Sequence, residues 1–155
     1  MAQPENITSG VSDSRSQIDI LRKRGLNLRV LNRDVPLFES RGSGMKPLLE
    51  TIRLLGRSRL RGTIVVDKIV GKAAAILMAY FRPSEVHCRT LSRRAEGILA
   101  RYGILYHAEE IVPEICRPGT DDLCPFEEAV LDVETPLQGY RRLVLRLLSL
   151  RNPDC

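Results

Sequence analysis

Asp67, Lys68 and Lys72 place one carboxylate and two ammonium groups within a short stretch, T-I-V-V-D-K-I-V-G-K-A-A-A, that begins at Thr63. Its β-branched residues predict a strand, and Gly71 predicts the turn that precedes a helix. The backbone N–H groups and the positive end of the helix dipole point toward such a junction. We therefore expect the junction to bind an anion, such as a phosphate group.

A second junction of this kind, S-R-G-S-G-M-K, covers residues 40–46, and the two junctions contain three of the four lysines of the chain. If both helices begin at the same edge of a sheet, the junctions lie side by side and form a pocket for phosphate or a nucleotide. The P-loop sequence G-x-x-x-x-G-K-[ST] is absent. The predicted ligand-binding residues are Ser40, Gly44, Lys46, Asp67, Lys68, Gly71 and Lys72.

In this pocket the lysines would neutralise the anion, Gly44 and Gly71 would present backbone N–H groups, and Asp67 would orient the ligand. The neighbouring lysines would favour the ionised form of Asp67 and keep it usable as a nucleophile. The alternative interpretation is structural: the glycines serve turns, and Asp67 pairs with a lysine.

Cys124 is the second candidate nucleophile, because it precedes the predicted short helix P-F-E-E. A helix N-terminus lowers the pKa of a thiol, whereas Glu127 and Glu128 in the same turn would oppose thiolate formation. A structural role at the start of the helix is therefore the alternative. No second positioned acid or base accompanies either candidate, so no reaction mechanism follows from the sequence.

The composition limits the classes of partner. The chain of 155 residues carries a net charge of +5, but it has no tryptophan and only 5% aromatic residues. Stacking surfaces for single-stranded nucleic acid are therefore scarce, and no specific nucleic-acid binding is expected. No apolar run has the length of a membrane span, and the N-terminal residues lack the features of a signal peptide. We expect a cytoplasmic protein with reduced cysteines.

The order of the elements predicts an α/β fold with a mixed central sheet of about five strands, covered on both faces. We expect a disordered tail at residues 1–14, one domain at residues 15–134 and a basic amphipathic helix within residues 135–155. That last helix would pack on the domain or on a partner such as a second copy of the chain, rather than on a membrane. The predicted strands are residues 26–30, 35–40, 63–66, 85–90 and 104–107, and the predicted helices are residues 16–25, 47–55, 72–81, 92–103 and 137–150, with a short one after Cys124.

Three segments make the chain recognisable: S-R-G-S-G-M-K-P-L-L from Ser40, V-D-K-I-V-G-K-A-A-A from Val66, and T-D-D-L-C-P-F-E from Thr120. In this order they resemble the family called domain of unknown function 1893, and the resemblance covers roughly residues 28–130. It implies a cytidine-deaminase-like fold, a three-layer α/β/α sandwich. The family has no established biochemical role.

The implied fold raises the question of zinc. Zinc deaminases carry H-x-E or C-x-E at the start of one helix and P-C-x-x-C at the start of the next. The corresponding helices here begin with G-M-K-P and G-K-A, so we expect no metal, no cofactor and no zinc-dependent deamination. A literal H-A-E at residues 107–109, with Cys116 and Cys124 downstream, lacks the C-x-x-C spacing and follows a late strand. We expect these residues to be structural rather than a zinc site.

Three functional hypotheses remain open. The first is a zinc-free deaminase-like domain that binds a nucleotide or another phosphorylated ligand. The second is a metal-independent nucleotide hydrolase or transferase that uses Asp67 or Cys124. The third is a protein-interaction module without a small-molecule ligand, with the C-terminal helix as its contact surface.

Overall fold

The structure is a computed structural model that describes residues 13–150. The helices are α1 (Ser14–Lys23), α2 (Lys46–Leu60), α3 (Lys72–Phe81), α4 (Arg93–Arg101), α5 (Pro125–Ala129) and α6 (Pro136–Ser149). The strands are β1 (Leu28–Asn32), β2 (Val35–Ser40), β3 (Ile64–Val70), β4 (Glu85–Ser92) and β5 (Leu105–Val112). They form one sheet in the order β2-β1-β3-β4-β5, in which β1 is antiparallel to β2 and β3, and β3, β4 and β5 are parallel. The predicted α/β class with a mixed five-stranded sheet is confirmed.

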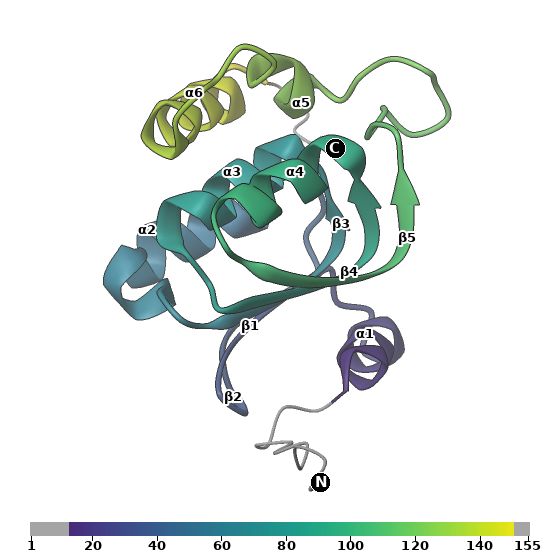
Figure 1. Cartoon of the computed structure of the whole chain (residues 1–155), viewed down its shortest axis with the longest axis vertical. Coiled ribbons are helices and arrows are strands. Elements are labelled where there is room, and N and C mark those ends of the chain that lie inside the picture. Colours follow the sequence, from purple (N-terminus) through teal and green to yellow (C-terminus); the bar gives the residue numbers. More distant parts are fainter. Residues whose placement is uncertain (1–12, 151–155) are drawn as a thin grey trace, which may run out of the picture.

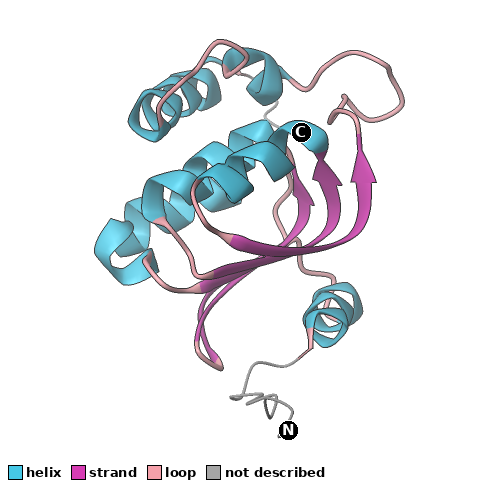
Figure 2. Cartoon of the chain, viewed as in Figure 1, coloured by secondary structure: helices cyan, strands magenta, loops and turns pink. Residues whose placement is uncertain are grey.

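Helices cover both faces of this sheet (Figures 1 and 2). Of the helices within residues 13–150, α1 lies on one face, whereas α2, α3 and α4 lie side by side on the other. Helices α5 and α6 form a further layer outside α3. The C-terminal helix therefore packs on the domain itself, where Tyr140 of α6 stacks on Tyr80 of α3 with ring centroids 4.6 Å apart.

Strand β1 is buried on both of its faces, although the alternation in its sequence predicts a half-buried strand. Leu28 and Val30 belong to the main core beneath α2 and α3, while Leu31 belongs to a smaller cluster beneath α1. Arg29, the polar member of the alternation, is also buried. Alternation of apolar and polar residues predicts that one face of a strand is buried. The position of α1 in the structure shows that the other face of β1 is covered as well.

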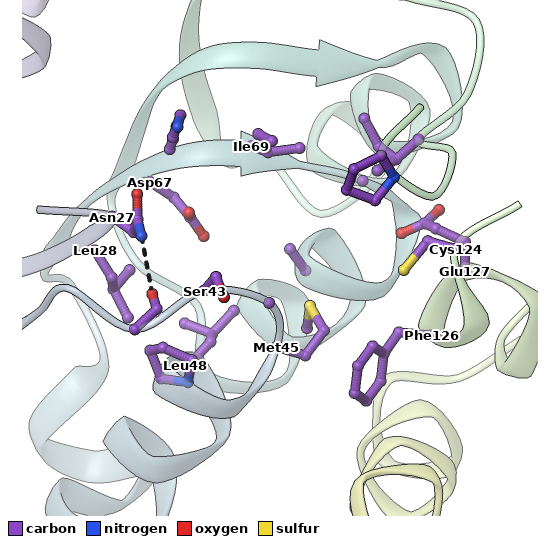
Figure 3. Close-up of a pocket in the computed structure, with 18 of the residues that line it drawn as sticks. Asn27, Leu28, Ser43, Met45, Leu48, Asp67, Ile69, Cys124, Phe126 and Glu127 are labelled. Carbon is purple, nitrogen blue, oxygen red and sulfur yellow. Dashed lines mark hydrogen bonds between the residues drawn. The ribbon is translucent and has the colours of Figure 1, made fainter. Parts of the chain in front are cut away.

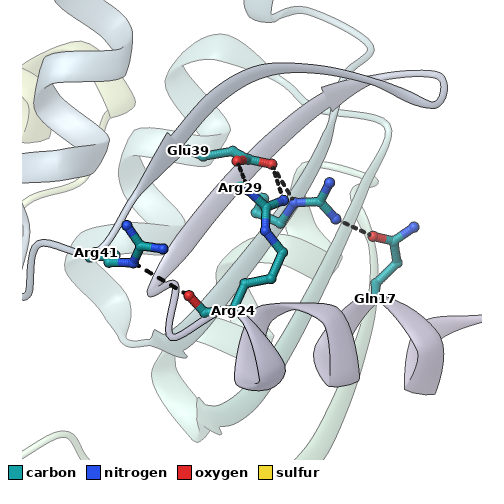
Figure 4. Close-up of polar contacts among 5 residues, drawn as sticks. All are labelled: Gln17, Arg24, Arg29, Glu39 and Arg41. Carbon is teal, nitrogen blue, oxygen red and sulfur yellow. Dashed lines mark hydrogen bonds and ion pairs between the residues drawn. The ribbon is translucent and has the colours of Figure 1, made fainter.

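The buried Arg29 is held by an ionic network that joins α1, β1 and β2 (Figure 4). Its Nε donates to Oε1 of Glu39 at 3.0 Å, and its Nη1 donates to Oε1 of Gln17 at 3.3 Å. Arg24 donates to both oxygens of the same Glu39 carboxylate, at 2.8 and 2.6 Å. The hydrogen bond from Arg24, followed by that from Arg29, holds the pKa of Glu39 below its usual value.

Glu39→Gln is expected to lower the free energy of unfolding at pH 7 by about 1–2 kcal/mol, because a buried guanidinium would lose its counter-charge. A lowered pKa in the folded state stabilises the fold above the ordinary pKa of glutamate and loses that contribution as the pH falls. The difference in the free energy of unfolding between the native protein and the variant should therefore become smaller in acid. Urea denaturation at pH 7 and pH 3.5 measures both quantities.

The matched control for this prediction is Asp132→Asn. Asp132 accepts a hydrogen bond from Arg142 at 2.6 Å, but this pair lies on the surface and its carboxylate is three-quarters exposed. Removing the same charge there should leave the stability nearly unchanged. Equal effects of the two substitutions would show that the Arg29 network contributes no more than a surface ion pair.

Several element boundaries differ from the prediction. Helix α1 begins at Ser14, so this residue belongs to a helix rather than to a tail, and residues 1–12 lie outside the described part of the chain. Gly56 interrupts α2 with φ 73°, but the helix resumes and continues to Leu60. The predicted bounds of α3 are confirmed. The helix predicted at residues 92–103 is α4, and Ser92 is its N-cap, because its Oγ accepts a hydrogen bond from the backbone N–H of Ala95 at 3.1 Å.

The C-terminal end of β3 is the boundary that bears on the candidate site. The sequence predicts that it ends at Val66, before the charged pair, whereas it continues to Val70. Pairing with β4 extends along the whole of this segment, from Ile64 opposite Glu85 to Val70 opposite Leu91. Asp67 and Lys68 are therefore strand residues whose side chains point to opposite faces of the sheet.

Candidate functional site

The candidate site lies where β3 extends beyond its neighbour β1. The last pair between these strands joins Leu28 to Asp67, and the backbone N–H of Lys68 then donates to the carbonyl of Asn27 at 3.1 Å. Beyond this point the edge of β3 faces the loop that leads into α2. A pocket of about 240 Å³ opens there, between β3, the start of α2 and the segment around residues 115–127 (Figure 3).

The wall of this pocket is largely apolar. Its polar side chains include those of Asp67 and Glu127, Lys68 borders it at the edge of the sheet, and Gly44 and Gly71 also line it. The apolar lining residues are Leu28, Met45, Pro47, Leu48, Ile69, Ala74, Ile115, Pro118 and Phe126. Such a wall suits the body of a small organic molecule rather than a fully hydrated anion.

The Asp67 carboxyl is the distinctive polar group of the pocket. It is half-buried, and no side chain within residues 13–150 donates a hydrogen bond to it. Burial raises the pKa of Asp67 to about 7, although the backbone amides of Ile69 and Lys68 favour the charged form. This contrasts with the expectation that neighbouring lysines keep the group ionised, because desolvation by the surrounding protein outweighs the two backbone hydrogen bonds, which alone favour the charged form.

The N-terminus of α3, which the sequence predicts to bind an external anion, is capped by a carboxylate of the protein. Glu127 accepts hydrogen bonds from the backbone N–H groups of Lys72 and Ala73, each at 2.9 Å. A Cβ atom at Gly71 would lie 2.3 Å from Oε1 of Glu127, so only glycine allows this approach. Burial raises the pKa of Glu127, and these two backbone hydrogen bonds oppose the shift.

Three predicted ligand-binding residues lie outside the lining of the pocket. The Nζ of Lys72 donates to the carbonyl of Leu131 at 2.9 Å, and desolvation lowers the pKa of this lysine. Lys46 is exposed at the first position of α2. The Oγ of Ser40 accepts from the backbone N–H of Gly42 at 3.0 Å and shapes the loop. Gly44, Asp67, Lys68, Gly71 and Cys124 do come together around the pocket.

Two further residues line the pocket, Asn27 and Phe126, and no motif in the sequence indicates that they do. The Nδ2 of Asn27 donates to the carbonyls of Arg41 and Gly42, at 2.9 and 3.2 Å, and so fixes the loop above the pocket (Figure 3). Phe126 is fully buried and closes the far side. Each of these contacts joins segments far apart in the chain, so no local pattern announces them.

The cysteines differ from one another in oxidation state and in exposure. Cys124 is disulfide-bonded, which overturns the expectation that every cysteine is reduced and removes the thiolate from this candidate nucleophile. It is the N-cap residue of α5. Cys88 and Cys116 are free. Burial raises the pKa of the Cys88 thiol to about 12, and Cys116 lines the pocket with its side chain partly exposed.

The H-A-E triplet belongs to strand β5, where His107 and Glu109 lie on the side of the sheet that α1 covers and Ala108 packs against the main core on the other side. Nε2 of His107 lies 2.8 Å from Oε1 of Glu85, and the ring of His107 stacks on that of the buried His87 with centroids 5.0 Å apart. Within residues 13–150, no three His, Cys, Asp or Glu side chains are arranged to hold a metal ion. In the same range, no helix is both long and apolar enough to traverse a bilayer.

Comparison with known proteins identifies the family. The model of the family described as "Domain of unknown function (DUF1893)" matches residues 16–145. A crystal structure of a DUF1893 family protein (TM1506) from Thermotoga maritima is similar, with a TM-score of 0.77 and 31% sequence identity, over 85% of this chain and 88% of that chain. No curated protein matches. The chain therefore belongs to the DUF1893 family, as the three sequence segments predict.

Proposed function

We propose that this protein binds a nucleoside or nucleotide, with the base in the apolar pocket and its polar edge hydrogen-bonded to Asp67. The observation that carries the proposal is the Asp67 carboxyl, half-buried in an apolar wall and without a side-chain donor among residues 13–150. The hydrogen bonds to this carboxyl come from the backbone amides of Ile69 and Lys68, and its oxygens can accept more. A ligand that supplies a further hydrogen-bond partner there gains affinity. A flat heteroaromatic base combines apolar faces with a hydrogen-bonding edge.

The protonation state of Asp67 would select the base. An ionised carboxylate accepts two hydrogen bonds, which suits the adjacent N–H groups of guanine. A protonated carboxyl donates one bond and accepts one, which suits the adjacent acceptor and amino group of adenine or cytosine. A pKa of about 7 makes both states accessible near neutral pH.

Among the predicted cationic residues, Lys68 is the one supported as the partner of a phosphate, because it alone of the three predicted lysines lines the pocket. Lys46 and Lys72 are directed elsewhere. The two carboxyl groups of the pocket, Asp67 and Glu127, would disfavour a phosphate in its interior. The phosphate of a nucleotide would therefore lie toward Lys68 and not at the start of α3.

The pH dependence of binding tests the role of Asp67. Between pH 6 and pH 8 the ionised fraction of a group with a pKa of about 7 rises about tenfold, so guanosine should bind about tenfold more tightly at pH 8. Adenosine or cytidine should show the opposite trend. Asparagine imitates the protonated acid, so Asp67→Asn should abolish guanosine binding and make the binding of adenosine or cytidine independent of pH. Calorimetric titration with the four nucleosides measures this.

Asp34→Asn serves as the control for this experiment, because Asp34 is exposed in the turn between β1 and β2, away from the pocket. It should bind as the native protein does. If none of the four nucleosides binds, or if Asp67→Asn keeps the native affinity and pH profile, the proposed function is wrong.

A second candidate function is an enzymatic one, favoured by the same carboxyl. A pKa of about 7 suits a general acid or base that acts on a bound nucleotide. The disulfide at Cys124 makes this residue the weaker candidate nucleophile. Turnover that persists in Asp67→Asn would exclude this role for the carboxyl.

A further inference from the structure

A second cavity, also of about 240 Å³, adjoins the candidate site on the opposite face of the sheet. It lies beneath the C-terminal end of α1, and it shares Asn27 and Lys68 with the first pocket. Ile64 and Val66 of β3 pack beneath α1, so the alternation of the strand directs Lys68 to this face and Asp67 to the other. Because the β1–β3 pairing stops at Asp67, the two cavities meet around the open edge of β3.

Two cations stand side by side in this second cavity. The parallel register pairs Asp67 with Cys88 and Ile69 with Thr90, which places Lys68 next to Arg89 of β4, on the same face. Like charges at neighbouring positions of adjacent strands repel each other. Within residues 13–150, neither side chain has a carboxylate partner within 4 Å. An anion placed between the two would relieve the repulsion.

The other charged groups around the cavity are already paired with each other. Arg22 of α1 also lines it, and its guanidinium contacts Oδ1 of Asp19 at 3.3 Å and Oε2 of Glu109 at 3.2 Å. Glu109 lies opposite Arg89 in the register of β4 and β5, but its ion pair is with Arg22. Both carboxylates are thus paired with Arg22, and Lys68 and Arg89 remain available for a ligand.

We propose that this cavity binds the phosphate group of the ligand, so that the chain is selective for nucleotides over nucleosides. The inference rests on the proposed function: the base lies against Asp67 on one face of β3, and the phosphate lies between Lys68 and Arg89 on the other. The ligand would cross the open edge of β3 near Asn27. Charge-assisted hydrogen bonds from an ammonium and a guanidinium are the usual means of holding a phosphate.

The test compares the four nucleosides with their 5′-monophosphates by calorimetric titration, in the native protein and in single variants. The monophosphate of the preferred base should bind at least about tenfold more tightly than the nucleoside, and increasing salt should reduce that ratio. Lys68→Gln and Arg89→Gln should each reduce the ratio to near unity, and Arg89→Gln, at a residue outside the lining of the base pocket, should do so with nucleoside affinity preserved. Arg59→Gln, an exposed cation of α2 away from both cavities, should leave the ratio unchanged.

Each outcome is decisive. If nucleoside and monophosphate bind equally well to the native protein, the inference fails and the proposed function stands. The inference also fails if the preference for the monophosphate survives in the double variant Lys68→Gln/Arg89→Gln, because the phosphate then binds elsewhere. If neither compound of any pair binds, both the inference and the proposed function are wrong.

Discussion

Glu127→Ala is expected to lower the free energy of unfolding by about 2–3 kcal/mol, because two backbone N–H groups at the start of α3 would lose their acceptor. Both hydrogen bonds are 2.9 Å long, and the carboxylate that accepts them is buried. These bonds also join α5 to α3, so their loss weakens a contact between segments far apart in the sequence. For a chain of this length we expect the Tm to fall by about 5–10 °C, measured by calorimetry.

Two substitutions serve as controls for Glu127. Glu128→Ala removes the neighbouring carboxylate of the same helix, but this side chain is exposed, so the stability should change by less than about 0.5 kcal/mol. Glu127→Gln keeps one oxygen acceptor, so its stability should lie between that of the alanine variant and that of the native protein. A native Tm in Glu127→Ala would show that the cap does not stabilise α3.

Gly139→Ala is expected to destabilise the fold by about 1–3 kcal/mol through crowding at the contact between α6 and α3. A Cβ atom at this position would lie 2.1 Å from Cγ2 of Ile76 and 3.2 Å from Cγ1 of Val133. The loss should occur although alanine is intrinsically a better helix former than glycine by about 1 kcal/mol. Urea denaturation would measure the change.

The chain offers a matched glycine for this test. Gly97 is an exposed helical residue of α4, and a Cβ atom there would meet nothing within 4 Å. Gly97→Ala should therefore stabilise the protein by about 0.5–1 kcal/mol. If both alanine substitutions stabilise, α6 does not pack on α3 as closely as the structure has it, and the stacked Tyr80–Tyr140 pair should be lost as well.

Local patterns in the sequence were sufficient for the class of fold. The bounds of α3 follow from a glycine before Lys72 and a proline after Phe81, and the Ser92 cap follows from a serine before a helical pattern. The alternation of strands and helices predicts a five-stranded mixed sheet, because each element must bury one apolar face. The three sequence segments also predict the family.

Local patterns did not predict how far β3 extends or that β1 is buried on both faces. Charged residues usually mark the end of a strand, yet Asp67 and Lys68 continue β3 because β4 supplies hydrogen bonds along its full length. The buried Arg29 likewise depends on Glu39 and Gln17, which other elements bring to it. In both cases the partner lies on a different element, and its position depends on the tertiary fold.

The same distinction applies to the candidate site. That Asp67, Lys68 and Gly71 lie near a strand–helix junction follows from local sequence, because these residues are close together in the chain. Two features of the site depend on long-range packing: Glu127, 55 residues from Lys72, caps that junction, and burial raises the pKa of Asp67 to about 7. The charge of a side chain is fixed by its type, whereas its desolvation and its partners depend on what the fold packs around it.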